Sequence, residues 1–227
     1  HQQLIPIQPA EGSTEPGLDG QTRLQNTLNL LDGISAPAVS WESDIYPARI
    51  PNYDPNWLDV FCISGKVMWG RYVLPLINHR RQNQPLQRKR NAGPVKSTPI
   101  SLVARSNLDI WQALAKAQLG EGEVAAPSAS AACIAADLEQ HGASFFDQIQ
   151  SRTGLLKTQL EQGLAELVSL GRVCSDSFTG LRALLTPNHK KPTSHKRRGR
   201  KAMFGVEDAG RWSLLDTFEQ EAGQQKP

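Results

Sequence analysis

The chain has 227 residues, of which 39% are hydrophobic and 21% charged, and its formal net charge is +3 at pH 7. This length suits one large domain or two of ordinary size, and the hydrophobic content is enough for real cores. No apolar run approaches the roughly 20 residues that cross a bilayer, and the first residues, HQQLIPIQPAEG, lack the basic start and apolar core expected of a signal peptide. We therefore expect a cytoplasmic protein with no membrane partner. Because the chain begins HQQLIPIQ without methionine, we also expect a fragment or a processed chain.

The first predicted elements are three helices. One follows a proline- and glycine-rich lead-in, carries a leucine stripe and ends near Gly33. The second is short, because it begins after Ser40 and must end before Pro47. The third runs from Asp54 to Gly65, since aspartate is a favourable N-cap, proline suits the first helical turn, and glycine closes a helix.

A strand over residues 67–74 follows, with apolar side chains that alternate between its faces. The polar, basic stretch NHRRQNQPLQRKRNAGPVKS leads from it to a return strand, TPISLVAR. Helices followed by a long hairpin are the outline of a winged helix, in which the hairpin is the wing. A further helix over SNLDIWQALAKAQLG precedes GEGEVAAPSASAA, whose glycine, alanine and serine predict a linker.

The pattern repeats beyond this linker. ACIAADLEQHG and LLKTQLEQGLAELVSLG are predicted helices, and SFFDQIQSRTG between them is a short helix with a capping box from Ser144 to Asp147. RVCSDSF begins a strand. We predict an α+β protein of tandem winged-helix modules, mainly helical with small β-wings and no sheet shared across the linker. The predicted parts are a lead-in (1–17), a first winged-helix-like module with a long basic hairpin (18–120), a linker (121–130), a second winged helix (131–186), and a basic loop and connector to a following domain (187–227).

Basic residues are concentrated in two blocks. Between Val60 and Leu108 there are nine lysines or arginines and no acid, and nine more lie between Arg182 and Arg211 against two acids. This distribution favours a polyanionic partner over solvated loops or a localisation tag. The three cysteines are far apart and the histidines have no metal-ligand spacing, so we predict no disulfide and no metal site.

Five stretches carry a resemblance to a known family. They are WESDIYPARIPNYDPNWLD, SGKVMWGR, HGASFFDQIQSRTG, LAELVSLGRVCSDSFTGLRALL and AGRWSLL, in this order. Together they resemble the region after the motor domains of the bacterial large helicase-related proteins, from about Thr22 to Leu215. The resemblance implies an accessory DNA-binding region of an ATP-dependent 3′-to-5′ DNA helicase that acts in DNA repair and associates with the nucleoid.

The resemblance also implies partners and cofactors outside this chain. The motor domains of the same parent protein would be partners and would bind ATP and magnesium. The chain itself contains neither a G-x-x-x-x-G-K-[ST] phosphate loop nor an Asp-Glu-x-His motor motif. We therefore expect no cofactor in this chain, no catalytic residue and no ATP hydrolysis by it alone.

The predicted DNA contacts lie in the basic loops. The helices carry acids such as Asp59 and Glu161, so we expect them to be scaffold, whereas the loops meet phosphates of a single strand or a junction without sequence preference. Trp69 is a candidate base-stacking residue, with a core tryptophan under the wing as the alternative. The predicted DNA-binding residues are Trp69, Arg71, Arg80, Arg81, Arg88, Lys89, Arg90, Lys96, Lys196, Arg197, Arg198, Arg200 and Lys201.

Two other classes of function remain open. The same region of the family resembles, in fold, bacterial DNA glycosylases built from tandem winged helices. A base-excising site needs a carboxylate or glutamine beside a flipped-base pocket, and Gln2, Gln3, Asp44 and Asp176 are conceivable, although Asp176 fits a wing turn better. The third class is a protein-interaction module with acidic helical faces.

Overall fold

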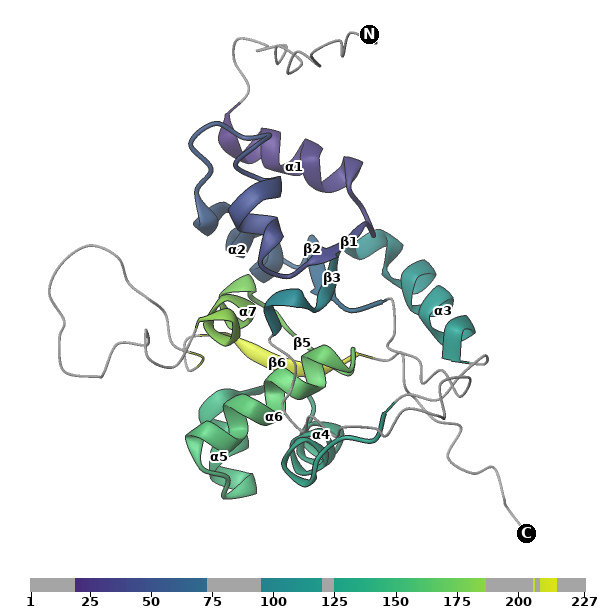
Figure 1. Ribbon diagram of the computed structural model, residues 1–227, viewed down its shortest axis with the longest axis vertical. Coiled ribbons are helices and arrows are strands. Elements are labelled where there is room, and N and C mark those ends of the chain that lie inside the picture. The colour runs from purple at the N-terminus through teal and green to yellow at the C-terminus, as the bar shows by residue number, and fades with distance from the viewer. Residues whose placement is uncertain (1–18, 73–94, 120–124, 187–205, 207–208, 216–227) are drawn as a thin grey trace, which may run out of the picture.

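The computed structural model describes residues 19–72, 95–119, 125–186, 206 and 209–215. Within these ranges the chain forms two separate three-stranded antiparallel sheets, each with its own helices (Figure 1). The predicted α+β architecture of tandem winged helices is confirmed. None of the described strands pairs across the predicted linker: the first sheet ends at Ala104 and the second begins at Ser144.

The first module has the element order of a winged helix: helix, strand, two helices and a hairpin. β3 is the middle strand, and it pairs Ser101 with Ser35 of β1 on one side and with Gly70 of β2 on the other. A one-turn π-helix at Trp41–Ile45 takes the place of the predicted second helix. The other elements are α1 (Gly20–Leu30), β1 (Ser35–Pro37), α2 (Pro55–Ile63), β2 (Val67–Gly70) and β3 (Pro99–Ala104).

Local signals fix α2. The Asp54 side chain accepts a hydrogen bond from the Asn56 backbone N–H at 2.9 Å, which satisfies an amide that the helix leaves without a partner. Pro55 occupies the first turn, and Gly65 takes the left-handed conformation just after the helix, at φ +70°. These three residues hold the helix within the bounds that the sequence predicts.

The second module repeats this order, with a further helix between the last two strands. Its sheet has β6 in the middle, where Trp212 lies between Ser144 of β4 and Ser175 of β5. The module therefore closes with a strand beyond residue 186, in the part of the chain that was predicted to be a basic loop and connector. Its elements are α4 (Ala129–His141), β4 (Ser144–Phe145), α5 (Phe146–Thr153), α6 (Lys157–Ser169), β5 (Val173–Ser175), α7 (Phe178–Leu185) and β6 (Arg211–Leu214).

The predicted capping box at Ser144 is wrong. Ser144 pairs within β4, and its hydroxyl accepts a hydrogen bond from Arg152 at 2.7 Å. Helix α5 begins two residues later, where the Gln148 side chain accepts from the Phe145 backbone N–H at 3.0 Å. Ser144 lies one residue before the N-cap, Phe145, and is held in the sheet, so its side chain does not cap the helix.

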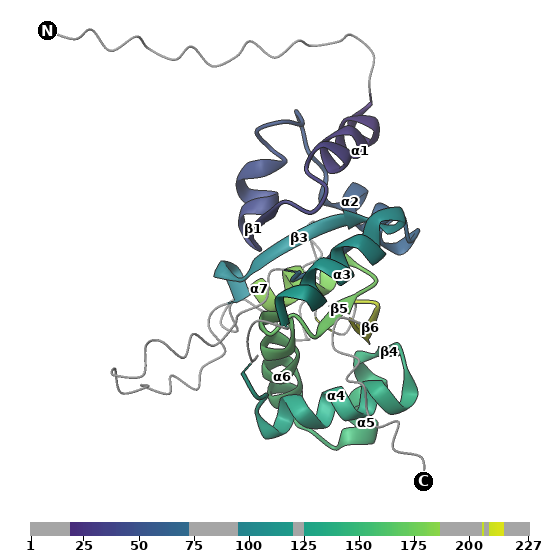
Figure 2. The ribbon, with the colours of Figure 1, turned by 90° about the vertical axis from the view of Figure 1, so that its right-hand side faces the viewer.

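A further helix, α3 (Leu108–Leu119), covers the outer face of the first sheet. Figure 2 shows it beside β3. Asp32, just after α1, fixes its start, because its carboxylate accepts hydrogen bonds from the Ala104 backbone N–H and the Asn107 side chain, both at 2.7 Å. Both faces of this sheet are therefore covered.

The two modules share one hydrophobic core. Trp69 of β2 meets Phe178 and Trp212 of the second module edge to face, with ring centroids 6.3 Å apart in each pair. The Trp69 indole N–H donates to the Ser177 carbonyl at 3.1 Å. The separate sheets are thus joined through side chains at the centre of the molecule.

Candidate nucleic-acid interface

Both basic blocks lie in equivalent places in the two modules. Seven of the nine basic residues of the first block fall between β2 and β3, and most of the second block falls between β5 and β6, so most of each block belongs to the wing segment of its own winged helix. We call residues 71–98 the first wing segment and residues 176–210 the second. Most of the predicted contact residues lie outside the described residues: Arg80, Arg81, Arg88, Lys89, Arg90, Lys196, Arg197, Arg198, Arg200 and Lys201.

The described ends of the two wing segments lie close together. The first returns through a short 3-10 helix, η3 (Val95–Ser97), which packs against α6 and α7. The second continues from the end of α7, whose eight residues span only about 12 Å. The two basic blocks are therefore attached to neighbouring points, although they are about 100 residues apart in the chain.

The prediction that Trp69 stacks on a base is wrong. Its side chain is fully buried, and its ring and N–H are occupied by the second module. The alternative prediction, that Trp69 is a core tryptophan under the wing, is confirmed. Trp41 and Trp212 are also fully buried, as predicted, while Trp57 and Trp111 are partly buried.

Arg71 joins the modules instead of facing solvent. Its guanidinium is half-buried and donates to the Ser169 carbonyl at the end of α6. Burial lowers the pKa of Arg71 below its ordinary value, but an arginine in a protein keeps its charge. Lys96, in contrast, is exposed on η3 beside α6 and α7, so it remains a candidate for phosphate contact.

An ion-pair cluster fixes α2 of the first module against α7 of the second. We call Arg182, Glu42 and Asp59 the inter-module cluster. The Arg182 guanidinium donates to Glu42 at 2.7 and 2.9 Å and to Asp59 at 2.6 Å, and it also reaches the Pro55 carbonyl at 3.0 Å. Burial alone would lower the pKa of Arg182, but the two carboxylates outweigh it and raise the pKa. One flank of α2 is thus occupied by protein.

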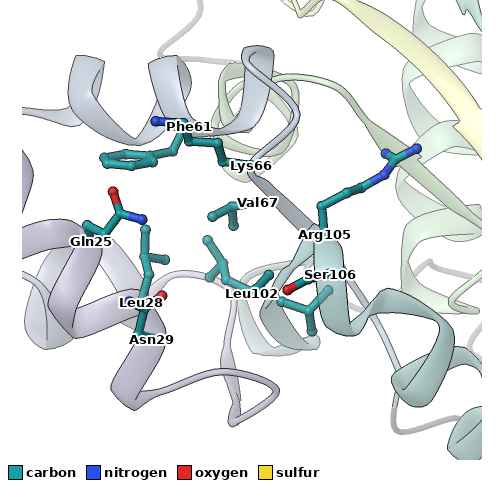
Figure 3. A pocket seen from close by; sticks show the side chains of 11 residues that line it. Gln25, Leu28, Asn29, Phe61, Lys66, Val67, Leu102, Arg105 and Ser106 are labelled. Atoms are coloured by element: carbon teal, nitrogen blue, oxygen red, sulfur yellow. The ribbon is translucent and has the colours of Figure 1, made fainter.

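A groove of about 350 Å³ lies on the first module between α1, the end of α2 and the β2–β3 hairpin (Figure 3). Its floor is apolar, with Leu28, Val67 and Leu102, and the Lys66 ammonium sits 5.6 Å from the centre of the Phe61 ring. The sequence does not reveal this groove, because its lining comes from segments that are distant in the chain. The groove lies at the end of the hairpin where β2 begins and β3 ends. The first wing segment lies at the other end, because it follows the last residue of β2.

The residues considered for base excision have other partners. Asp176 accepts from the Arg211 backbone N–H at 2.7 Å and from the Arg211 side chain at 3.0 Å, which makes it a wing-turn residue. Asp44 is exposed and accepts from the Ser43 hydroxyl at 2.6 Å. Gln2 and Gln3 lie outside the described residues. In the described ranges no cluster of three or more His, Cys, Asp or Glu residues is arranged to hold a metal ion.

The fold and these contacts define a tandem winged-helix protein whose wing segments are basic. Residues 2–83 match the family model described as "Large helicase-related protein, winged-helix domain". A Mycolicibacterium smegmatis protein named "Lhr helicase/ probable uracil glycosylase" is 29% identical over 230 residues, which is 92% of this chain. An Escherichia coli K12 protein named "Lhr helicase/uracil glycosylase" is 29% identical over 225 residues, or 89% of this chain. The resemblance to the large helicase-related proteins is confirmed.

The aligned region covers only 13% of the length of each of these two relatives. In the described part of this chain, no helix has the length and apolar character needed to cross a bilayer.

Proposed function

We propose that this chain is an accessory DNA-binding region of an ATP-dependent 3′-to-5′ helicase acting in DNA repair in the bacterial cytoplasm. Its partners would be the motor domains of the same parent protein and a DNA strand or junction. The basic wing segments would hold the tracking single strand through its phosphates, without reading its sequence. ATP and magnesium would bind to the motor domains and not to this region.

The observation that carries this proposal is the position of the basic residues. Most of each block falls in a wing segment, and the described ends of the two segments are anchored at neighbouring points on α7 and η3. A DNA strand that contacts one wing segment is then within reach of the other. Phosphate contacts supply most of the affinity of sequence-independent binding, so two adjacent basic segments suit that task.

The first test removes charge from the first wing segment. In a variant with Arg88, Lys89 and Arg90 all changed to Ala, up to three phosphate contacts are lost. We expect the slope of log affinity against log salt for single-stranded DNA to fall by up to about 2, at about 0.7 per contact. Fluorescence anisotropy between low and physiological salt measures this slope, and the loss should be similar for different DNA sequences.

A matched control removes the same charge elsewhere. Arg49, Arg105 and Lys116 are exposed residues of the first module outside the wing segment. Changing these three to Ala should leave the slope within about 0.7 of the original, the size of one contact. An equal fall in both variants would show that binding follows net charge alone, and an unchanged slope in the wing variant would place the contacts elsewhere.

The names of the two relatives make base excision a second candidate, because both mention uracil glycosylase. The chain can be incubated with an oligonucleotide that contains one uracil and then treated with alkali. Strand breaks at the uracil that disappear when Asp44 or Asp176 is changed to Asn would establish this function. An intact oligonucleotide would leave strand holding as the function of this region.

A further inference from the structure

The groove on the first module combines an apolar floor with a positively charged rim. Leu28, Val67 and Leu102 form the floor, and the exposed Lys66 and Arg105 lie at the rim (Figure 3). The described residues that line the groove include these two cations and no aspartate or glutamate. Pockets that bind ligands pair an apolar lining with a few polar or charged groups that set orientation. The lining therefore favours an occupant that has one apolar part and negative charge beside it.

The charge at the rim is not neutralised by the described protein. Within the described ranges neither cation forms an ion pair, and the Arg105 guanidinium is turned outward, where it donates to the Met68 sulfur at 2.9 Å. Asp32, just after α1, is the acid whose partners reach this region. Its two oxygens are held by the Ala104 backbone N–H and the Asn107 side chain. An incoming carboxylate thus meets positive charge at the groove.

The apolar surface continues from the groove along α3. Ser106 lines the groove, and Ile110 and Leu114 follow it at intervals of four residues, which places the three along one side of the helix. Ile110 and Leu114 are 60% and 51% exposed, whereas Leu108 and Ala115 on the opposite side are buried against the first sheet. Large exposed apolar side chains next to a groove are typical of a surface that binds another protein.

The groove suits a protein segment better than a strand of nucleic acid. A stacked base needs an open aromatic face. Phe61 is only 7% exposed, and the Lys66 ammonium already lies 5.6 Å from the centre of its ring. The rest of the floor is aliphatic, and a volume of about 350 Å³ admits a side chain with its backbone. The groove also lies at the opposite end of the hairpin from the first wing segment, away from the proposed DNA contacts.

Residues 216–221 of this chain, DTFEQE, have the same chemistry, but their starting point is unfavourable. The described chain ends at Leu215, which lies beside Gly70 at the far end of β2 from the groove. Phe218 follows three residues later and reaches at most about 10 Å. The path along β2 from Gly70 back to Val67 is itself about 10 Å. A segment of another protein approaches the groove without this restriction.

We propose that the groove and the exposed side of α3 bind an acidic segment of another protein. One apolar side chain of that segment sits on the floor beside Leu28, and its carboxylates lie near Lys66. The amides of Gln25 and Asn29, which are exposed on the α1 wall of the groove, donate hydrogen bonds to its backbone carbonyls. This site is separate from the wing segments, so the inference does not depend on the proposed DNA-binding function.

Fluorescence anisotropy of a labelled peptide tests the site on the full chain. The probe is a short peptide with one central phenylalanine flanked by glutamates, at about 0.15 M salt, where charges beyond about 8 Å are screened. Lys66→Glu is compared with Lys116→Glu, which reverses an exposed lysine on another side of α3. Asn29→Trp, which fills the groove, is compared with Asn26→Trp, an exposed residue of α1 that does not line it.

Lys66→Glu and Asn29→Trp should each weaken peptide binding by about tenfold or more, because the first repels the glutamates and the second occupies the space of the anchor. Lys116→Glu and Asn26→Trp should change it by less than about threefold. A peptide with serine in place of phenylalanine should also bind about tenfold or more weakly, since it loses the buried anchor. Thermal melts confirm that all four variants are folded.

Several results would overturn this inference. Equal losses within either matched pair, undiminished binding of the serine peptide, or no binding of the probe by the unmodified chain would show that the groove is not a peptide site. Displacement of the peptide by single-stranded DNA would assign the groove to nucleic acid. Binding that tightens about tenfold in the Phe218→Ser variant would show that residues 216–221 occupy the groove.

Discussion

Trp69 joins the two modules through one hydrogen bond and two edge-to-face ring contacts. Its alternation with Met68 along the strand is visible in the sequence, but the partner of its ring is not. Trp69 packs in the core that both modules share, while Met68 packs on the smaller cluster under α3. A wing-proximal tryptophan beside an arginine has the sequence features of a stacking residue. Only the docking of Phe178 and Trp212, more than 100 residues away, decides that it is buried.

Substitution of Trp69 is therefore expected to act on stability. Trp69→Ala should lower the free energy of unfolding by about 3–5 kcal/mol, as for other large buried aromatics. Trp69→Phe keeps part of the ring contact but leaves the Ser177 carbonyl without its donor, which costs about 1–3 kcal/mol. Urea denaturation followed by tryptophan fluorescence measures both values. Unchanged stability together with weaker single-strand binding would restore the stacking role.

At the scale of the elements, α4 and α5 are tied by a two-pronged ion pair. The Arg152 guanidinium donates to both oxygens of Asp137, each at 2.7 Å, and to the Ser144 hydroxyl. The hydrogen bonds from Arg152 hold the pKa of Asp137 below its ordinary value of 3.8. Because protonation of Asp137 breaks the pair, the stability that the pair gives to the second module depends on pH.

The direction of that dependence follows from linkage. The unfolded chain returns Asp137 to its ordinary pKa, so the stabilisation is complete above about pH 5 and is lost as the pH falls through the lowered folded value. Arg152→Met should lower stability by about 1–3 kcal/mol at pH 7 and by less near pH 3, where the unfolded chain already protonates most of its Asp137. Urea midpoints at the two pH values measure the difference. A loss of the same size at both would mean that packing, and not the charge, is responsible.

Elements marked by local signals are the ones that the sequence predicts well. Asp54, Pro55 and Gly65 define α2 within a few residues, because capping and backbone preferences act within one turn of the chain. Strand β6 shows no such signal, since its pairing partners Ser144 and Ser175 are distant in sequence and a basic segment intervenes. Of the candidate site, the sequence reveals the clustering of charge. It does not reveal which helix faces remain exposed, because that depends on how the modules pack.

For the whole molecule, the shared core and the inter-module cluster predict that the modules unfold together. Arg182→Met would leave Glu42 and Asp59 near each other without their cation, at a cost on the order of 3 kcal/mol. We expect calorimetry to give one unfolding transition for the unmodified chain and a lower midpoint for the variant. Arg49→Met, which removes an exposed arginine of the first module, should stay within about 0.5 kcal/mol. Two transitions in the unmodified chain would show that the modules are independent.

The strand order of both sheets has a consequence during synthesis on the ribosome. In each sheet the middle strand, β3 or β6, is the last to be made, so the two outer strands have no partner until it emerges. Between Ser175 and Arg211 the ribosome adds 36 residues, which takes roughly 2–7 s at 5–20 residues per second. Trp212 arrives with β6, and it completes the edge-to-face contact with Trp69. The buried centre of the first module therefore stays uncovered on one side until nearly the whole described chain has been translated.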